Sequence, residues 1–350
     1  MLDMLRGWIF KPISPINDMY LNNIHLKDIY SNLQNYFVEI DHDFLKDIIF
    51  SASGSDFPWK NKEFIRKIKL SYNKASKRAI GLESLMGKNR KISFRLITRL
   101  KELSNVSWDK IEKNIISICA GKNSKGKVYI KFPLVLDKDF GMIVGHILGD
   151  GSIDKKYNQV FFTNKDKNLS LEFFKLMKSK FGIDGRIWLQ KSGKFAEKSK
   201  WIKRINTPDE IPANSQIGLF YPTICGKILN IIFGDFAIGK EKKISNKILN
   251  FPSEFKIGLI RAFFDDEGHM DRERGPRFHQ DREEMLEKIR IMLGEFNINS
   301  CPVRSYFREG KERYYFNVNH RDNYTKYYKL IGSGSEKKLK VLQNLVANAQ

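Results

Sequence analysis

A helical pattern of small residues occurs twice in this chain, and it constrains the fold more than any other feature. Residues 141–151 read GMIVGHILGDG, and residues 258–268 read GLIRAFFDDEG. Both copies place a small or short residue at every fourth position, and both end in an acid followed by glycine. The match continues without a gap from 151–154 to 268–271. The sequence therefore contains an internal duplication.

Residues spaced by four lie on one face of a helix. Glycine costs about 1 kcal/mol in a helix interior relative to alanine, so several glycines on one face indicate a packing requirement. We predict that the two helices pack closely through these faces and end together at Gly151 and Gly268, in the left-handed cap position. Charged residues in the second copy argue against a membrane-spanning pair. The two faces are Gly141, Gly145 and Gly149, and Gly258, Ala262 and Asp266.

This packing would bring Asp150 and Glu267 side by side at two helix C-termini. The helix macrodipole disfavours negative charge there, so the pair needs a cation. Carboxylate oxygens suit Mg²⁺, and carboxylate-bound metals can catalyse phosphodiester hydrolysis. The alternative, that each acid only begins a turn, is ordinary for one Asp-Gly pair. It does not account for two copies in matching register.

Further features repeat in the same order after each motif. Residues 161–164 correspond to 278–281 as strands, and 171–183 correspond to 285–298 as amphipathic helices. A lysine-containing block follows in both, at 239–244 and 334–339. The first repeat is longer between motif and lysine block, which predicts a longer hairpin loop within 186–217.

The composition favours a polyanionic partner. The chain has 62 Lys and Arg against 40 Asp and Glu, a formal net charge of +22, which favours salt-dependent nucleic-acid binding. Charge alone fits a ribosomal protein, a regulator or a nuclease, and the duplicated acids favour the nuclease. Segments 186–190, 201–205 and 313–320 mix aromatic and basic residues as strands would, and such strands can contact the major groove.

Residues before 127 lie outside the duplication and read as mostly helical. Basic residues are dense between Arg66 and Lys91. This segment predicts either a DNA-binding module of helix-turn-helix type or a basic helical bundle of no particular type. Since no run of about 18 apolar residues occurs, we expect no membrane partner and a soluble, cytoplasmic protein.

The two motifs resemble those of the LAGLIDADG homing endonucleases, in the single-chain type that carries two copies. They are residues 144–151 (VGHILGDG) and 261–268 (RAFFDDEG). The first departs from the family in having Leu148 where Asp is frequent, and the second has Glu267 where Asp is commoner. Both metal positions remain acidic.

The resemblance implies an α+β fold of two pseudo-symmetric LAGLIDADG repeats, each with a helix and a saddle-shaped antiparallel sheet, after a mostly α-helical N-terminal domain. We expect three parts: residues 1–126, 127–250 and 251–350. The resemblance also implies a monomer that binds double-stranded DNA and makes staggered double-strand breaks with Mg²⁺ or Mn²⁺.

The resemblance further implies the site residues. Asp150 and Glu267 would be metal ligands, with Gly149 and Asp266 beside them at the metal. Basic residues near the end of each repeat would stabilise charge at the scissile phosphate. The alignment offers Lys242 or Lys243 and Lys337 or Lys338, and we take Lys243 and Lys338 as the candidates. A solvated or phosphate-contacting role is the alternative for these lysines. Gln280 is a weaker catalytic candidate, as is Thr163, because both can be half-buried strand residues.

Two other functions remain open at this stage. A descendant that no longer cleaves could bind DNA as a regulator, although retention of both acids argues against it. An intron maturase could bind RNA and still keep the acids. Metal-dependent cleavage would separate enzyme from regulator, and preference for structured RNA would identify a maturase.

Overall fold

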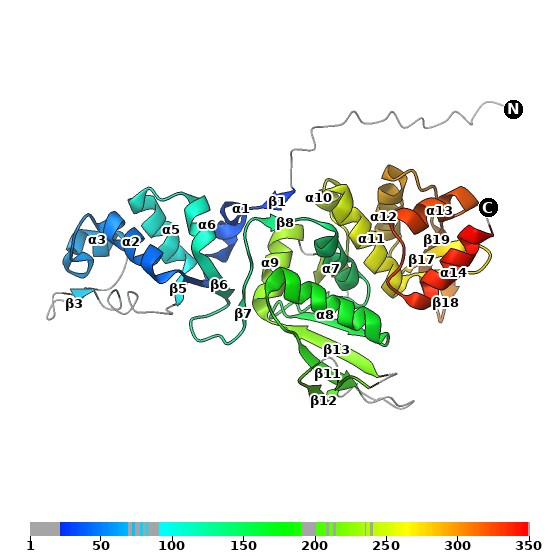
Figure 1. The fold of residues 1–350 in the computed structure, drawn as a ribbon, viewed down its shortest axis with the longest axis horizontal. Helices are drawn as coiled ribbons and strands as arrows, with labels where there is room; N and C mark the ends of the chain where they lie inside the picture. The colour runs from blue at the N-terminus through cyan, green and yellow to red at the C-terminus, as the bar shows by residue number, and fades with distance from the viewer. Residues whose placement is uncertain are drawn as a thin grey trace, which may run out of the picture.

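A computed structural model of the chain describes residues 22–68, 72–73, 78–79, 82, 91–190, 201–207, 210–212, 215–234, 236–238 and 241–348. An N-terminal segment, a first repeat and a second repeat follow one another across the molecule (Figure 1). Parts of three expectations fall outside the described residues: the basic stretch within 69–90, the loop at 191–200, and residues 239–240 of the first lysine block.

The N-terminal segment is mainly helical but also contains a sheet that the sequence did not predict. Its antiparallel strand order is β5-β2-β6-β7, and each strand is at most five residues long, too short for a clear alternation of polar and apolar residues. The elements are α1 (Leu26–Ile29), η1 (Tyr30–Leu33), β2 (Phe37–Ile40), α2 (His42–Ser53), η2 (Pro58–Lys60), α3 (Lys62–Lys67), β3 (Tyr72–Asn73), β4 (Arg78–Ala79), β5 (Lys91–Ser93), α5 (Phe94–Ser104), α6 (Trp108–Asn114), β6 (Ile115–Cys119) and β7 (Lys127–Val128).

Two strand pairings tie this segment to the rest of the chain. β1 (Asn23–Ile24) pairs with β8 (Leu134–Val135), immediately before the first motif helix. β7 begins at Lys127 and pairs with β6, so the N-terminal sheet extends past residue 126. The three-part division is therefore still a prediction. The N-terminal sheet extends two residues past the predicted boundary at residue 126.

The first repeat consists of a motif helix and a seven-stranded sheet of order β12-β11-β13-β10-β9-β14-β15. Its strand pairs are antiparallel except that β14 runs parallel to β9. The elements are α7 (Lys138–Leu148), β9 (Gly151–Ile153), β10 (Val160–Asn164), α8 (Lys167–Phe181), β11 (Arg186–Gln190), β12 (Trp201–Ile205), β13 (Gln216–Tyr221), α9 (Thr223–Phe233), β14 (Ala237–Ile238), β15 (Glu241–Lys242) and α10 (Asn246–Leu249).

The second repeat follows the same order from its motif helix through two strands and an amphipathic helix to a pair of strands and a further helix, with a four-stranded antiparallel sheet, β16-β17-β19-β18. Its elements are α11 (Ser253–Glu267), β16 (His269–Asp271), β17 (Gly275–Gln280), α12 (Glu283–Glu295), β18 (Arg304–Arg308), β19 (Lys311–Asn317), α13 (Arg321–Leu330) and α14 (Glu336–Ala347). The matched strands fall in β10 and β17, and the matched amphipathic helices are α8 and α12. The α+β fold with two repeats is confirmed, and the additional residues of the first repeat include the edge strand β12.

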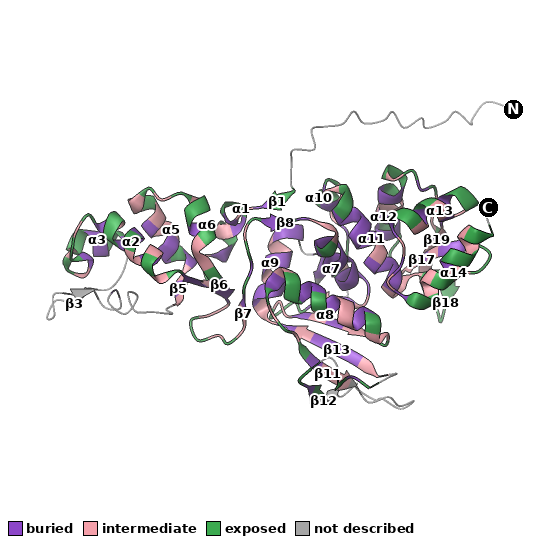
Figure 2. Ribbon diagram, viewed as in Figure 1, coloured by how far each residue is buried: buried purple, intermediate pink, exposed green. Residues whose placement is uncertain are grey.

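The two motif helices, α7 and α11, pack face to face at the buried centre of the molecule (Figures 1 and 2). A Cβ atom at Gly141 would lie 1.9 Å from the carbonyl oxygen of Phe255, and one at Gly258 would lie 1.9 Å from that of Lys138. At Gly145 the nearest atom would be the carbonyl oxygen of Leu259, at 2.4 Å. The prediction that glycine allows backbone-to-backbone contact between these helices is confirmed.

The prediction of left-handed glycine caps at both helix ends is wrong. Gly268 follows α11 with φ −82° and ψ 160°, which is extended backbone, and Gly151 lies inside β9. Close packing, and not a left-handed backbone, explains why both residues are glycine. A Cβ at Gly151 would lie 2.6 Å from the Cα of Ile147, and one at Gly268 would lie 2.2 Å from the Phe264 ring.

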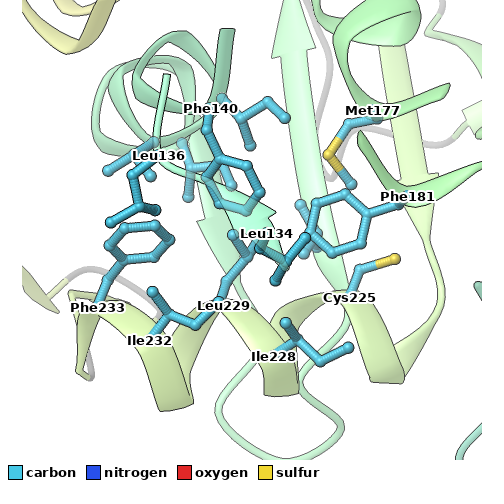
Figure 3. Close-up of a cluster of buried hydrophobic side chains, with 14 of the residues drawn as sticks. Leu134, Leu136, Phe140, Met177, Phe181, Cys225, Ile228, Leu229, Ile232 and Phe233 are labelled. Atoms are coloured by element: carbon cyan, nitrogen blue, oxygen red, sulfur yellow. The ribbon is translucent and has the colours of Figure 1, made fainter. Parts of the chain in front are cut away.

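An apolar cluster fixes the start of α7 in the first repeat (Figure 3). Phe140 of α7 points into a group of side chains from α8, α9 and the segment after β8, and its ring centroid lies 5.6 Å from that of Phe233. All labelled members are buried. They are Leu134, Leu136, Phe140, Met177, Phe181, Cys225, Ile228, Leu229, Ile232 and Phe233. The motif helix is thereby held both at its glycine face and at the Phe140 side chain.

Candidate functional site

The C-terminal ends of α7 and α11 carry the acids that end the two motifs. Burial, followed by the charges of Asp266 and Glu267, raises the pKa of Asp150 to about 7. Burial also raises the pKa of Glu267, with further contributions from Asp266 and Asp281. The structure therefore brings Asp150, Asp266 and Glu267 into one electrostatically coupled group, as the duplication predicts.

Asp266 is fully buried and already has protein partners. Its Oδ2 lies 3.0 Å from His146 Nδ1 and 3.5 Å from the amide nitrogen of Asp150. Its Oδ1 accepts a hydrogen bond from Asn164 Nδ2 at 3.2 Å, and the same Nδ2 donates to Asp150 Oδ2 at 2.9 Å. Asn164 thus bridges acids from the two repeats and fixes their relative position.

His146 connects this acid group to a second set of charges. Its side chain is fully buried, and its Nε2 lies 3.6 Å from Glu172 Oε2. Burial alone would lower the pKa of His146, but Asp266 and Glu172 outweigh it and raise the pKa to about 10. Arg261 Nη2 donates to Glu172 Oε1 at 3.0 Å. His146 is therefore an imidazolium held between two carboxylates in the core of the repeat interface.

A half-buried lysine from each repeat caps the end of a motif helix. Lys242 Nζ donates to the carbonyl oxygen of Gly149. Lys338 Nζ donates to the carbonyl oxygens of Phe264 and Asp265, at 2.9 and 2.7 Å. A cation at a helix C-terminus satisfies unpaired carbonyls and complements the macrodipole. Burial lowers the pKa of both lysines, while nearby acids oppose the shift.

The structure distinguishes between neighbouring lysine candidates. Lys242 is partly buried in β15, and the charges of Glu267, Asp150 and Asp266 all act on it. Lys243 is exposed and acts instead on Glu284, whose pKa is lowered first by Lys288 and to a lesser extent by Lys243. In the second repeat Lys338 is the inward residue, and Lys337 is exposed. Our choice of Lys338 agrees with this geometry, whereas Lys242 takes the place that we expected for Lys243.

Residues 137–208 and 254–332 match the LAGLIDADG-like domain. Both repeats belong to the LAGLIDADG-like family. Each matched segment contains one motif helix, the first two strands of its sheet and the amphipathic helix that follows. The family assignment and the internal duplication therefore describe the same two regions of the chain.

Similarity to individual proteins covers different lengths. The chain is 28% identical over 214 residues to the DNA-directed RNA polymerase subunit Rpo1C of Methanocaldococcus jannaschii, which is 61% of this chain and 21% of that protein. It is 23% identical over 297 residues to the replication factor C small subunit of the same organism, which is 84% of this chain and 14% of that protein. The chain thus matches about a fifth or less of these relatives.

A solved structure of mesophilic variants of the homing endonuclease I-DmoI aligns with this chain at a TM-score of 0.40 and 16% identity. The alignment covers 60% of this chain and 98% of that one.

The LAGLIDADG carboxylates fit a cation only in part. Among the described residues, the one set of three side chains whose ligand atoms lie within 4.8 Å of one another is elsewhere, in the N-terminal segment. The oxygens of Asp266 are held by His146 and Asn164, and the Gly149 carbonyl accepts from Lys242. The donors that remain are the carboxylate of Glu267 and that of Asp150, whose Oδ2 also accepts from Asn164. This pair fits Mg²⁺ or Mn²⁺ if further oxygen ligands come from outside the protein.

Gln280 and Thr163 occupy matching strand positions and differ in their surroundings. Gln280 lies beside Glu267, and its side chain lowers the pKa of that acid, partly opposing the effect of burial. Its Oε1 accepts from the Asp281 amide at 2.7 Å. The Thr163 hydroxyl accepts from Gln216 Nε2 at 3.4 Å. Of the two candidates, the structure places Gln280 at the acid group.

The outward face of the second LAGLIDADG sheet is basic and aromatic. Alternation turns Phe278 and Phe316 into the core, so their neighbours face outward. Arg277 stacks over the Tyr315 ring at 5.0 Å, and Tyr306 contacts the same ring with centroids 5.6 Å apart. By register this face carries Arg277, His279, Arg304, Tyr306, Arg308, Lys311, Arg313 and Tyr315.

Sequence reasoning missed three polar residues at this interface: His146, Asn164 and Glu172. Asn164 had a signal, because it corresponds to Asp281 at the end of a matched strand. His146 and Glu172 had none, since their partners come from other elements and their sequence spacing fits no metal site. Their contacts exist only once α7, α8 and α11 are packed.

Proposed function

We propose that this chain is a site-specific DNA endonuclease that uses Mg²⁺ or Mn²⁺ to make staggered double-strand breaks. The observation that carries this proposal is the meeting of Asp150 and Glu267, one acid from each repeat, at the ends of two packed helices. Burial of this pair beside Asp266 raises the pKa of both acids. A divalent cation would compensate that charge.

The residues around the acids have separable roles in this proposal. When bound, a divalent cation would stabilise charge on the scissile phosphate and acidify the attacking water. Asp150 and Glu267 hold the cation, and Asn164 and His146 fix the orientation of the acid group. Lys242 adds positive charge beside the carboxylates, and Gln280 offers a polar side chain next to Glu267. Lys338 maintains the end of α11.

The surface outside the acid group supports a DNA partner. The formal charge of +22 favours a polyanion, and the arginines of β17, β18 and β19 lie on one sheet face with aromatic side chains between them. Such a surface can contact phosphates and base edges. Two unequal repeats in one chain suit a monomer on an asymmetric target. The N-terminal segment would extend the contact as a second DNA-binding module.

The test is cleavage of genomic DNA related to the host but lacking this gene, with Mg²⁺, with all new ends mapped by sequencing. Asp150→Asn and Glu267→Gln remove the two proposed ligands. Asp139→Asn and Glu254→Gln are matched controls, because they change exposed residues at the opposite ends of the same helices. We expect recurrent staggered ends from the wild type and both controls, and none from the ligand variants.

The alternative functions give different results in the same experiment. Tight, salt-sensitive binding of duplex DNA without new ends from any protein would contradict the endonuclease and support a DNA-binding regulator. Preference for structured RNA over duplex DNA would support an intron maturase. Ends that persist in both ligand variants would show that the acids are not the catalytic groups.

A further inference from the structure

Three potential metal ligands converge in the N-terminal segment, away from the LAGLIDADG acids. His25, Asp109 and Glu112 each offer one ligand atom, and these atoms all lie within 4.8 Å of one another. His25 is the N-cap residue of α1, and the two acids lie on α6, three residues apart. That spacing places both acids on the same side of α6.

Glu112 is the residue that makes this cluster unusual. Its side chain is 3% exposed, and neither carboxylate oxygen has a hydrogen-bond partner of standard geometry. The imidazole Nδ1 of His25 lies 3.3 Å from Glu112 Oε1. Burial raises the pKa of Glu112, and His25 and the backbone amide of Leu26 only partly oppose that shift. A buried carboxylate without a hydrogen bond of standard geometry is costly, so it calls for a ligand.

The other two residues are suited to complete a site. The His25 amide donates to Asp28 Oδ2 at 2.8 Å, which fixes the backbone from which the imidazole projects. His25 Nδ1 is also buried without a hydrogen bond of standard geometry, although its side chain as a whole is 35% exposed. Asp109 is exposed at the edge of the cluster. An ion could therefore enter from the Asp109 side and reach the buried Glu112.

We propose that His25, Asp109 and Glu112 form a binding site for a divalent transition-metal ion of the Zn²⁺ type. One imidazole nitrogen with two carboxylate oxygens is a ligand set that Zn²⁺ accepts, with its fourth position left to water. Mg²⁺ and Ca²⁺ prefer oxygen ligands alone, so the histidine selects against them. The site is separate from the proposed catalytic acids and does not depend on cleavage.

The position of the cluster gives the ion a structural role. His25 directly follows β1, and β1 pairs with β8 just before α7. An ion shared by His25 and α6 would cross-link the beginning of the N-terminal segment to its last helix. It would thereby hold this segment at a fixed place beside the first repeat.

The test is a zinc titration of the full chain, stripped of metal, against a chromophoric chelator and in excess Mg²⁺. The protein carries Asp150→Asn and Glu267→Gln throughout, so that the LAGLIDADG acids cannot supply the signal. In this background we compare His25→Ala, Asp109→Asn and Glu112→Gln with Asp43→Asn. The last is the control, since Asp43 is 89% exposed on α2 of the same segment.

We expect one equivalent of zinc to bind, with a rise in melting temperature. His25→Ala and Glu112→Gln should weaken zinc binding by at least about tenfold, Asp109→Asn should weaken it less, and Asp43→Asn should not change it. Glu112→Gln should also raise the melting temperature of the metal-free chain, because the buried charge is removed. The absence of zinc binding, or binding that all three substitutions leave unchanged, would overturn the site and leave a plain His25–Glu112 ion pair. Should either buried-residue variant fail to fold, the exposed Asp109→Asn variant still decides the outcome.

Discussion

The motif helices α7 and α11 have the same packing face but end in different ways. α7 stops at Leu148, so Asp150 lies just beyond the helix, whereas α11 continues through Glu267 as its last residue. The longer side chain of Glu267 therefore projects from helical backbone. The shorter side chain of Asp150 projects from the residue directly before β9. The two repeats bring carboxylates to one place through different local structures.

The same helices also differ in the residues that accompany the acids. Position 266 of α11 is a buried aspartate, and its counterpart in the first repeat is Gly149. Position 146 of α7 is a buried histidine, and its counterpart is Phe263. Each helix therefore contributes one half of a charge pair that the other lacks. The fold is pseudo-symmetric, but the two helices contribute different charged residues to their interface. Some of the contacts are therefore shared by both repeats, and others belong to one repeat alone.

The largest effect should come from the shared glycine face. Gly141→Ala would place a Cβ atom 1.9 Å from the Phe255 carbonyl oxygen, so the helices would have to separate. We expect a loss of more than about 3 kcal/mol in the free energy of unfolding, measured by urea denaturation. Gly294→Ala in α12, with no atom within 4 Å of the added Cβ, is the control. A stable Gly141→Ala protein would contradict the close contact.

The second largest effect should come from the His146–Asp266 pair. His146→Phe installs the residue of the second repeat and leaves Asp266 buried without its cation. We expect a loss of about 3 kcal/mol in the free energy of unfolding. Adding Asp266→Gly, the residue of the first repeat, should recover about half of that loss despite the helix cost of glycine. Equal losses in the single and double variants would show that the charge pair does not stabilise the interface.

Asp150 should make the stability of the metal-free chain depend on pH. Its pKa rises from 3.8 to about 7 on folding, so the folded state binds the proton more tightly and loses stability as pH rises through that interval. Asp150→Asn cannot titrate. We expect its stability advantage over the wild type to grow by about 3 kcal/mol between pH 4 and pH 7. Asp139→Asn should follow the wild type, and Mg²⁺ should remove the advantage.

The smallest effect concerns neighbouring lysines in the first repeat. If the proposed endonuclease activity holds, Lys242→Met should slow cleavage about tenfold, or about 1.4 kcal/mol, because Lys242 lies beside the carboxylates. Lys243→Met should change the rate by less than about twofold, since a rim charge contributes little. Cleavage rates on one mapped target, at saturating Mg²⁺, would measure both. A larger loss at Lys243 would contradict the geometry.

The sequence predicted the helix pair, the repeated strands and the acid group because each depends on local spacing. A glycine at every fourth position identifies a helix face without knowledge of the partner, and a repeat doubles that signal. The same glycines misled the prediction of caps, because glycine is required both for a left-handed backbone and for close approach. At Gly151 and Gly268 the reason is close approach.

The remaining features depend on three-dimensional contacts, which residue spacing in the sequence does not reveal. Neighbouring residues point in opposite directions along extended backbone, so Lys242 and Lys243 can be told apart only when the register of β15 is known. The contact between His146 and Asp266 joins residues 120 positions apart, and the sheet of the N-terminal segment is assembled from very short strands. Tertiary contacts decide each of these.

The contact between His146 and Asp266 also bears on the ancestry of the chain. Two copies of the first repeat, paired through the same helix face, would set His146 against Gly149. Two copies of the second would set Asp266 against Phe263. The first dimer would leave His146 with Glu172 as its one carboxylate partner, and the second would bury the Asp266 charge without a histidine. The two halves are therefore chemically adapted to each other, because only their pairing places His146 beside Asp266.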